Sequence, residues 1–154
     1  MSRPRPSGPG SRTPGAYLLL FRLPRLDGVD VARLGRYDLP AGIYAYAGSA
    51  LGGLEARVGR HLAGKGTRHW HIDYLLEHAV DRGAYILPSD RDIECELADQ
   101  VAGIEGATRP IKGLGSSDCR CFSHLFHLTP TAVLGLERRM GERGAAYAGA
   151  RLGR

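Results

Sequence analysis

The stretch AYLLLFRL, residues 16–23, constrains the fold of this 154-residue chain more than any other, because it is apolar on both of its faces. A strand that packs on one side only alternates apolar and polar side chains, whereas a strand covered on both sides is a continuous apolar run. We therefore expect residues 16–23 to form a central strand. A chain of this length forms one domain that can bury a core without disulfide or metal staples.

Hydrophobic periodicity divides the rest of the chain into further strands and helices. We expect strands over 41–48, 82–88 and 123–128, and helices over 51–63, 70–79, 91–104 and within 129–144. These elements do not alternate regularly between strand and helix. The pattern favours an α+β fold with a small, mainly antiparallel central sheet flanked by helices and an extra N-terminal hairpin.

Turn and cap residues set the expected boundaries of these elements. Asp27-Gly28 is a turn signal, and an exposed hairpin is expected around Gly35. Gly64 is expected to stop the helix over 51–63. Ser89 or Asp90 is the expected cap of the helix over 91–104.

The two ends of the chain differ in composition from its middle. Residues 1–14 are rich in Pro, Gly, Ser and Arg and contain no acid, so we expect a disordered basic tail. This tail is either a solubilising leader or an arm that touches nucleic acid. Residues 15–128 carry the domain, and residues 129–154 are expected to form a C-terminal helix and a frayed end.

The net charge of +5 is unevenly distributed along the chain. Residues 71–108 contain nine acidic residues against Arg82 and Arg91, whereas residues 51–70 contain one acid, Glu55. The cations of this second segment are Arg57, Arg60, Lys65 and Arg68. Clustered cations are what phosphate contacts need, so the segregation favours a polyanionic partner.

Cysteine count and hydropathy bear on where the protein works. Three cysteines, an odd number, argue against a disulfide framework and favour a reducing cytoplasm. No apolar run approaches the roughly 18 residues that cross a bilayer, and no apolar segment of a secretory signal precedes residue 17. We therefore expect a cytoplasmic protein with no membrane partner. The sequence predicts no oligomeric state.

The stretch YAGSALGGLEARVGRHLAG, residues 46–64, combines a strand end, a glycine turn and a helix. Its apolar stripe consists of Leu51, Leu54, Val58 and Leu62. Arg57 and His61 lie four residues apart, on one helix face that borders this stripe. Such a pair is either a solvated helix edge or a contact for a phosphate.

The order of several short motifs resembles the GIY-YIG nuclease superfamily. The motifs are Gly15-Ala16-Tyr17 at the head of one strand, Tyr46-Ala47-Gly48 at the end of another, the helix with Arg57 and His61, and Glu94-Cys95-Glu96 on a later helix. The literal GIY at 42–44 is interpreted as coincidence, because the two motifs of the family lie on separate strands. PAGIYAYAGSA, HWHIDYLL and GLGSSDCRCFSHLFHL resemble the Uri-type endonuclease branch, long catalogued as a domain of unknown function. The resemblance spans residues 15–128.

The resemblance implies a metal-dependent endonuclease that hydrolyses phosphodiester bonds in DNA, with RNA not excluded, in DNA repair or processing. Glu94 would hold one Mg²⁺ or Mn²⁺ ion, and it lies nearer the buried side of its helix than the alternative, Glu96. Arg57 would contact the scissile phosphate.

Tyr17 and Tyr46 would orient or deprotonate the attacking water, and His61 would accept a proton. A free tyrosine has a pKa near 10, so it serves as a base only beside the metal, Arg57 or His61. Further contacts to the nucleic acid are expected from Ser49, Arg60, Lys65, Arg68 and Trp70, of which Trp70 can stack on a base.

Two departures from the family pattern stand out. The spacing from Gly48 to Arg57 is about one residue longer, because of the letters LGG. The asparagine that many members carry late in the domain has no counterpart after Pro110, and SSDCRC, residues 116–121, can take its place.

Two further clusters have partial metal-binding patterns. His69, His71 and Asp73 match most of an H-x-H-x-D-H motif, but position 74 is Tyr, so capping and packing on the helix over 70–79 are favoured.

Cys119, Cys121 and His124 have a tighter spacing than most zinc sites, and a fourth ligand would have to be His127 or Cys95. Free thiols are favoured over zinc. They would lie in a loop that shapes the site and that also contains Asp118. Two rival functions stay open: a catalytically inactive nucleic-acid-binding module of the same fold, and an enzyme that acts on a small phosphodiester.

Overall fold

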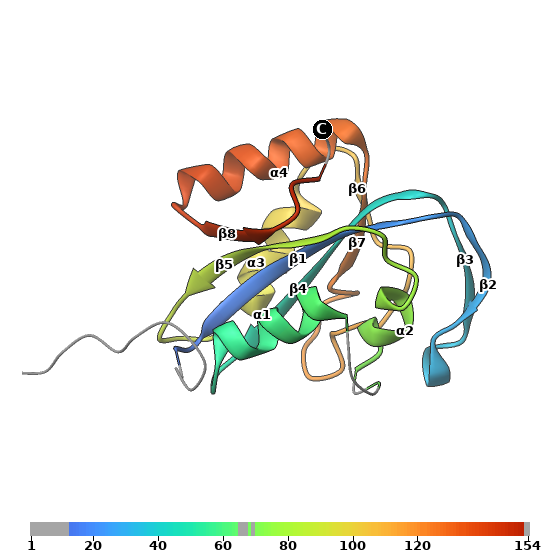
Figure 1. Cartoon of the computed structure of the whole chain (residues 1–154), viewed down its shortest axis with the longest axis horizontal. Coiled ribbons are helices and arrows are strands. Elements are labelled where there is room, and N and C mark those ends of the chain that lie inside the picture. The colour runs from blue at the N-terminus through green and yellow to red at the C-terminus, as the bar shows by residue number, and fades with distance from the viewer. Residues whose placement is uncertain (1–12, 65–67, 69, 153–154) are drawn as a thin grey trace, which may run out of the picture.

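The computed structural model describes residues 13–64, 68 and 70–152, and helices cover both faces of one sheet (Figure 1). The strands are β1 (Gly15–Leu23), β2 (Leu26–Asp30), β3 (Arg36–Leu39), β4 (Gly42–Ala50), β5 (Arg82–Pro88), β6 (Ala107–Thr108), β7 (Leu125–Leu128) and β8 (Ala146–Gly149). The helices are the 3₁₀ turn η1 (Ala32–Leu34) and α1 (Leu54–Ala63), α2 (Ile72–Leu76), α3 (Glu94–Ala102) and α4 (Pro130–Glu142).

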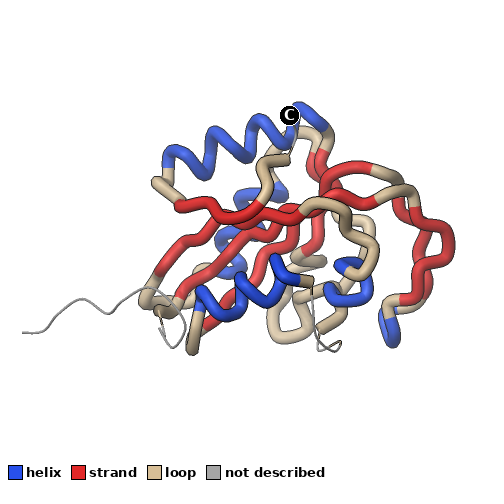
Figure 2. Tube along the Cα trace, in the orientation of Figure 1, coloured by secondary structure: helices blue, strands red, loops and turns tan. Residues whose placement is uncertain are grey.

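The main sheet has the strand order β6-β7-β4-β1-β5-β8, and every neighbouring pair is antiparallel. The predicted central strand is confirmed, because β1 lies between β4 and β5. The α+β fold is confirmed as well. The two-stranded sheet β2-β3 is the expected N-terminal hairpin, and it extends from one side of the molecule (Figure 2).

Strand alternation in β1 divides the core into two halves. Ala16, Leu18 and Leu20 face one half, together with buried residues of α3 and α4. Tyr17 and Leu19 face the other half, with buried residues of α1, α2 and the hairpin. The continuous apolar run of β1 is therefore explained by packing on both faces. Tyr17 and Tyr46, the two tyrosines predicted as site residues, lie in the half of the core that packs against α1.

Several predicted boundaries are corrected by the structure. Asp27-Gly28 lies within β2 and does not form the turn, which is made by η1 and by Gly35 with φ 107°. Helix α1 begins at Leu54, and Leu51 is 65% exposed in the turn before it, so Leu51 does not belong to the apolar stripe. The helix ends as predicted at Gly64, whose φ of 68° is left-handed.

The next two helices are shorter than predicted. Helix α2 has five residues where ten were expected. The backbone N–H of Glu94, the first residue of α3, donates to Asp92 Oδ1 at 3.0 Å, so neither Ser89 nor Asp90 supplies that contact. Ser89 Oγ instead accepts from the Arg91 N–H within the preceding loop.

The C-terminal segment is part of the fold, and the expectation of a frayed end is wrong. Helix α4 begins at a Thr129 cap whose hydroxyl accepts from the Ala132 N–H at 3.1 Å. Strand β8 then pairs with β5, where Tyr147 packs edge-on against Tyr85 at 4.8 Å between ring centroids. Leu152 is buried beyond it. Pairing with β5 supplies hydrogen bonds that the local sequence pattern does not reveal.

Most of the predicted basic tail, residues 1–12, lies outside the described residues. Thr13 and Pro14 contact the domain, since their carbonyl oxygens accept from the N–H groups of Leu54 and Ser89. Among the described residues, no helix combines the length and the apolar composition that crossing a bilayer requires.

Gly48 is expected to be indispensable for the packing of Tyr17. A Cβ atom at Gly48 would lie 2.4 Å from Tyr17 Cζ, so Gly48→Ala must displace the ring and should destabilise the fold by about 1–3 kcal/mol. Gly59→Ala is the matched control, because no atom lies within 4 Å of the added Cβ on α1. It should stabilise by up to about 1 kcal/mol through helix propensity. Urea denaturation measures both, and equal stabilities for the two variants would contradict the prediction.

Candidate active site

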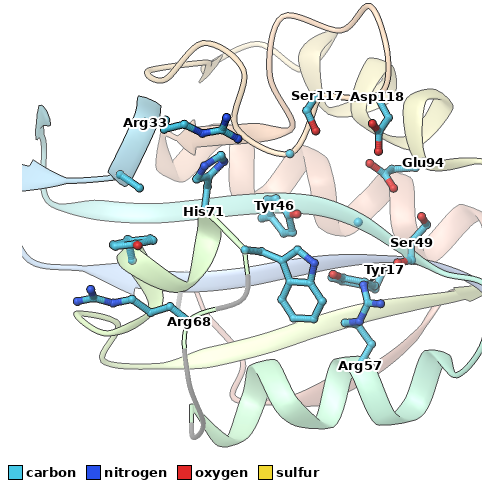
Figure 3. Close-up of a pocket in the computed structure, with 15 residues that line it drawn as sticks. Tyr17, Arg33, Tyr46, Ser49, Arg57, Arg68, His71, Glu94, Ser117 and Asp118 are labelled. Atoms are coloured by element: carbon cyan, nitrogen blue, oxygen red, sulfur yellow. Dashed lines mark hydrogen bonds between the residues drawn. The ribbon is translucent and has the colours of Figure 1, made fainter. Parts of the chain in front are cut away.

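A cleft of about 500 Å³ opens on the α1 side of the sheet (Figure 3). Its lining comes from β1, β4, α1, the N-terminus of α3, the segment before α2, η1 and the loop over 115–118. Seven of the residues predicted from the sequence line it: Tyr17, Tyr46, Ser49, Arg57, Arg68, Trp70 and Glu94. The structure thus brings together side chains that are up to 77 positions apart in the sequence.

Two of the predicted site residues that the structure describes, His61 and Arg60, do not line this cleft. His61 is buried behind Tyr17, with 1% of its surface exposed. Arg60 is turned toward Asp73, with 3.4 Å between Nη2 and Oδ2. Lys65 lies outside the described residues, as does His69.

Tyr17 and Tyr46 lie on adjacent strands and on the same face of the sheet. The β1–β4 register pairs Tyr17 with Gly48 and Leu19 with Tyr46, and the two tyrosine ring centroids are 6.4 Å apart. Gly115, with φ +77°, leaves room for Tyr46, since a Cβ there would lie 2.7 Å from Tyr46 Cε1. Gly48 of the Tyr46-Ala47-Gly48 motif has a similar role, because it pairs with Tyr17 and a Cβ there would clash with the Tyr17 ring. The glycine of the motif therefore leaves room for the tyrosine of the neighbouring strand.

The literal GIY at 42–44 makes no contribution to the cleft. Tyr44 stacks on Phe21 at 5.8 Å, and its hydroxyl donates to the Pro40 carbonyl at 2.6 Å. The interpretation of this motif as a coincidence agrees with that position.

Tyr17 and His61 form a buried polar pair. The Tyr17 hydroxyl lies 2.9 Å from His61 Nε2. Burial raises the pKa of Tyr17 to about 12, against the opposing effect of the Arg57 charge. Burial also lowers the pKa of His61 to about 4. Near pH 7 both groups are therefore neutral, and the hydroxyl can donate to Nε2 when the imidazole carries its proton on Nδ1.

The charges around His61 act in both directions. Asp73 favours the imidazolium and raises the pKa of His61, whereas the guanidinium groups of Arg57, Arg60 and Arg82 lower it. Burial of Tyr46 raises its pKa well above the ordinary value. Neither cleft tyrosine is thus ionised near neutral pH.

Trp70 and Asp73 position the arginines of α1. The Arg57 and Arg60 guanidinium carbons lie 4.4 and 4.6 Å from the centroid of the Trp70 ring. Asp73 Oδ2 accepts from the Trp70 N–H at 3.0 Å and pairs with Arg60. Arg57 Nη1 also donates to the Ser49 carbonyl at 3.1 Å. The pairing of Asp73 and the packing of Trp70 in HWHIDY are confirmed, and base stacking by Trp70 stays a prediction.

Glu94 is the acidic residue of the pair Glu94/Glu96 that reaches the cleft. Its Oε2 lies 2.6 Å from His124 Nδ1. Glu96 points elsewhere and pairs with Arg91 at 2.8 Å. Figure 3 shows the carboxylates of Glu94 and Asp118 pointing toward one another across the end of the cleft. The preference for Glu94 over Glu96 as the cleft residue is supported by this geometry.

Several residues that line the cleft, Arg33, His71 and Ser117 among them, were not named as site residues from the sequence. Arg33 arrives from η1 of the hairpin, and Ser117 arrives beside Asp118 from the SSDCRC loop. His71 also lines the cleft. The sequence indicated this loop only through SSDCRC, residues 116–121, which can take the place of the asparagine that many family members carry. No such signal indicated Arg33, because only the docking of the hairpin brings it to the cleft.

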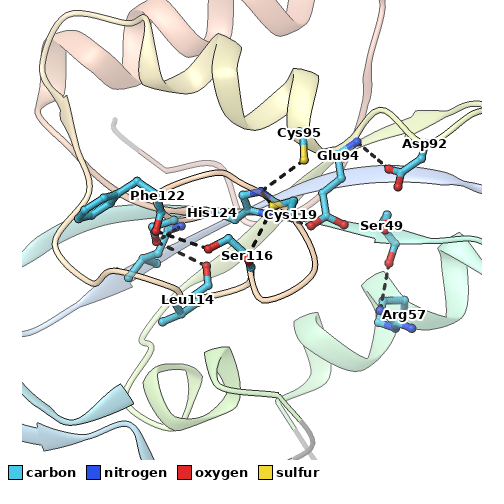
Figure 4. A network of polar contacts seen from close by, with 12 residues as sticks. Ser49, Arg57, Asp92, Glu94, Cys95, Leu114, Ser116, Cys119, Phe122 and His124 are labelled. Carbon is cyan, nitrogen blue, oxygen red and sulfur yellow. Dashed lines mark hydrogen bonds and ion pairs between the residues drawn. The ribbon is translucent and has the colours of Figure 1, made fainter. Parts of the chain in front are cut away.

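A second cluster consists of Cys95, Cys119, Cys121 and His124. Figure 4 shows Cys95, Cys119 and His124 next to Glu94. One potential ligand atom from each residue lies within 4.8 Å of all the others, so the group is close enough to hold a metal ion. Of the two candidates for a fourth group, Cys95 lies with Cys119, Cys121 and His124, and His127 does not belong to the cluster. The interpretation as free loop thiols stays a prediction, because the structure shows three free cysteines that are close enough to hold an ion together with His124.

Residues 16–143 match the sequence family described as Domain of unknown function DUF123. The chain belongs to this family. Comparison of this chain with curated proteins and with solved structures found no match. The DUF123 assignment covers β1 through α4, hence the whole cleft and the Cys/His cluster, and it assigns no activity to either.

The buried His61 of this DUF123 domain should make its stability depend on pH. The unfolded side chain takes up a proton near its ordinary pKa of 6.5, but the folded one does so only near 4. Between these values the unfolded chain binds more protons, so the free energy of unfolding falls as the pH drops from 6.5 to 4. The full effect of His61 is about 3 kcal/mol.

His61→Gln should flatten this dependence relative to the wild type, because Gln does not titrate. The measurement is urea denaturation at several pH values across the window. The exposed His78, replaced by Gln, is the matched control and should keep the wild-type slope. An unchanged slope in His61→Gln would show that His61 is not held neutral.

Proposed function

We propose that this DUF123 domain is a metal-dependent endonuclease that hydrolyses phosphodiester bonds in DNA, with RNA as the second polymer to be compared. The observation that carries the proposal is the convergence of Tyr17, Tyr46, Arg57 and Glu94 on one cleft, from β1, β4, α1 and α3. Phosphodiester hydrolysis needs a positioned water, a proton acceptor, and positive charge at the phosphoryl oxygens. The cleft contains groups suited to each task.

Arginines supply the positive charge. Arg33, Arg57 and Arg68 line the cleft from three separate elements. Arg68 is also paired with Glu77, so part of its charge is offset. Arg57 is the best placed to contact a scissile phosphate, because Trp70 and the Ser49 carbonyl fix its guanidinium beside Tyr17. Preorganised positive charge of this kind favours the transition state, in which charge on the phosphoryl oxygens increases.

The carboxylates of the cleft fit a hard divalent cation. Mg²⁺ and Mn²⁺ are bound through one or two carboxylates with water and substrate phosphate completing the shell. Glu94, with Asp118 opposite, would hold such an ion. The ion would supply Lewis-acid polarisation of the phosphate and stabilisation of the leaving oxygen.

Protons are handled by the Tyr17–His61 pair in this proposal. With a pKa of about 12, Tyr17 is a hydroxyl and not a phenolate at neutral pH, so it cannot deprotonate water by itself. The Tyr17 oxygen can accept a proton from the water while its own proton passes to His61 Nε2, 2.9 Å away. Tyr46 orients the water from the adjacent strand. His61 thereby acts from behind Tyr17, without lining the cleft.

A nucleic-acid-binding module without activity is the second candidate, and one observation favours it. Glu94 Oε2 is in contact with His124, so the carboxylate already has a structural partner. If that partner is its main role, the basic cleft binds a polyanion and leaves it intact.

The test is a panel of labelled DNA and RNA substrates, single-stranded, double-stranded and branched, incubated with Mg²⁺, Mn²⁺ or EDTA. Glu94→Gln should abolish cleavage, because Gln keeps the size of the side chain and loses the charge that recruits the cation. Glu96→Gln is the matched control and should cleave at the wild-type rate. Cleavage of no substrate by the wild type in either metal would favour the binding module.

Arg57→Ala should lower the single-turnover cleavage rate at least about a hundredfold, the loss typical of one preorganised contact to transition-state charge. Binding measured by filter titration should fall much less, since Arg33 and Arg68 remain. Arg138→Ala, on the exposed side of α4, is the control and should change neither quantity. Equal losses in cleavage efficiency and in binding would show that Arg57 contacts the phosphate equally in the ground state and in the transition state.

A further inference from the structure

All three cysteines of the chain meet at one point, together with a buried histidine. Cys95 is the second residue of α3, Cys119 and Cys121 belong to the loop before β7, and His124 is directly before that strand. His124 is fully buried. Cys95 and Cys119 are 24 positions apart in the sequence, yet all three thiols lie together. The packing of an apolar core does not require such an arrangement.

The spacing of these groups fits a tetrahedral metal site. His124 Nε2 lies 3.5 Å from Cys119 Sγ and 4.0 Å from Cys95 Sγ. A tetrahedral zinc ion with bonds of about 2.0 Å to nitrogen and about 2.3 Å to sulfur separates these ligand atoms by about 3.5 Å. The cluster therefore needs only small adjustments to close around an ion.

We propose that Cys95, Cys119, Cys121 and His124 bind one zinc ion in a closed structural site. Thiolate and imidazole ligands select zinc over Mg²⁺ or Mn²⁺, which prefer oxygen. Three sulfurs and one nitrogen fill the tetrahedral shell and leave no position for substrate, which distinguishes this site from the carboxylate end of the cleft. The zinc site does not depend on the proposed nuclease activity.

A zinc ion at this position would join two segments of the chain, the loop before β7 and the first turn of α3. The loop is closed on itself by backbone hydrogen bonds from Gly113 N–H to the Phe122 carbonyl and from His124 N–H to the Leu114 carbonyl, both 2.8 Å. Cys121 is next to Phe122, where the loop closes, and Cys119 lies at the far end of the loop, beside Asp118. A zinc ion shared with Cys95 would attach that end to the first turn of α3, and so fix Asp118 relative to Glu94.

Glu94 has a place in the same site as a partner of His124. Metal-bound histidines usually donate their second ring N–H to a carboxylate, which fixes the tautomer and the ring orientation. His124 presents Nε2 to the sulfurs and Nδ1 to Glu94 Oε2 at 2.6 Å. Glu94 is therefore a positioning residue for the zinc ligand as well as a wall of the cleft.

The first test is the metal content of the full chain, expressed with zinc in the medium and purified under reductant without added metal or chelator. Elemental analysis should find zinc at a stoichiometry near one. Anaerobic replacement by Co²⁺ should give the visible bands of tetrahedral cobalt and thiolate-to-cobalt charge transfer in the near ultraviolet. Iron in place of zinc, or no metal together with no uptake of Co²⁺, would overturn the proposal.

Variants assign the ligands. Cys95→Ser, Cys119→Ser and Cys121→Ser should each lose charge-transfer intensity and stoichiometric zinc. His127→Gln and His78→Gln are controls and should keep both. A Cys95→Ser variant with an unchanged cobalt spectrum would overturn the four-ligand set. If the serine variants do not fold, the wild-type cobalt spectrum still decides, since it reports thiolate ligation and tetrahedral geometry directly.

Glu94→Ala tests the positioning role without any nucleic acid. Loss of such a carboxylate partner typically weakens metal binding about 10–100-fold, which competition with a zinc chelator measures. Glu96→Ala, on the exposed side of the same helix, should bind zinc as the wild type does. Equal affinity in Glu94→Ala and wild type would remove Glu94 from the zinc site. It would leave the cleavage prediction for Glu94→Gln unaffected.

Discussion

Burial of β1 on both faces is the constraint on which the rest of the structure depends. A strand without a polar face needs two strand neighbours and a layer of apolar side chains on each side. β4 and β5 supply the neighbours, α3 and α4 cover one face, and α1, α2 and the hairpin cover the other. Because side chains alternate along the strand, Tyr17 is fixed on the α1 face, where its hydroxyl reaches the edge of the core.

The cleft depends on how these layers meet at one end of the sheet. Tyr17, Tyr46 and Arg57 come from the sheet and from the helix that covers its α1 face. Glu94 comes from α3, whose apolar residues pack on the opposite face. The carboxylate therefore reaches the tyrosines only because α3 begins at the cleft. The loop that supplies Asp118, Cys119 and Cys121 is packed against that first turn.

Features that depend on residues close together in the sequence could be predicted, whereas most features that depend on contacts between distant residues could not. The strand over residues 16–23 and the end of α1 at Gly64 were predictable because local pattern decides them. The pairing of the two tyrosines was predictable from the order of motifs. By contrast, β8 exists through its ladder with β5, and Arg33 reaches the cleft only through docking of the hairpin. Cys95 joins the other thiols across 24 positions, a distance at which spacing rules carry no information.

Burial also determines what chemistry the cleft residues can perform. Burial raises the pKa of Tyr17 to about 12, and the charge of Arg57 offsets this effect only in part. Tyr17 is therefore not a phenolate at neutral pH. A pKa of about 4 keeps His61 ready to accept a proton at neutral pH but makes it a weak base. Neither group is an effective base alone, so a proton transfer through the 2.9 Å contact must move both protons together. In the hydrolysis proposed above, the pair would thus suit a step in which the attacking water loses its proton as the new bond to phosphorus forms, and not one that stores a free hydroxide beforehand.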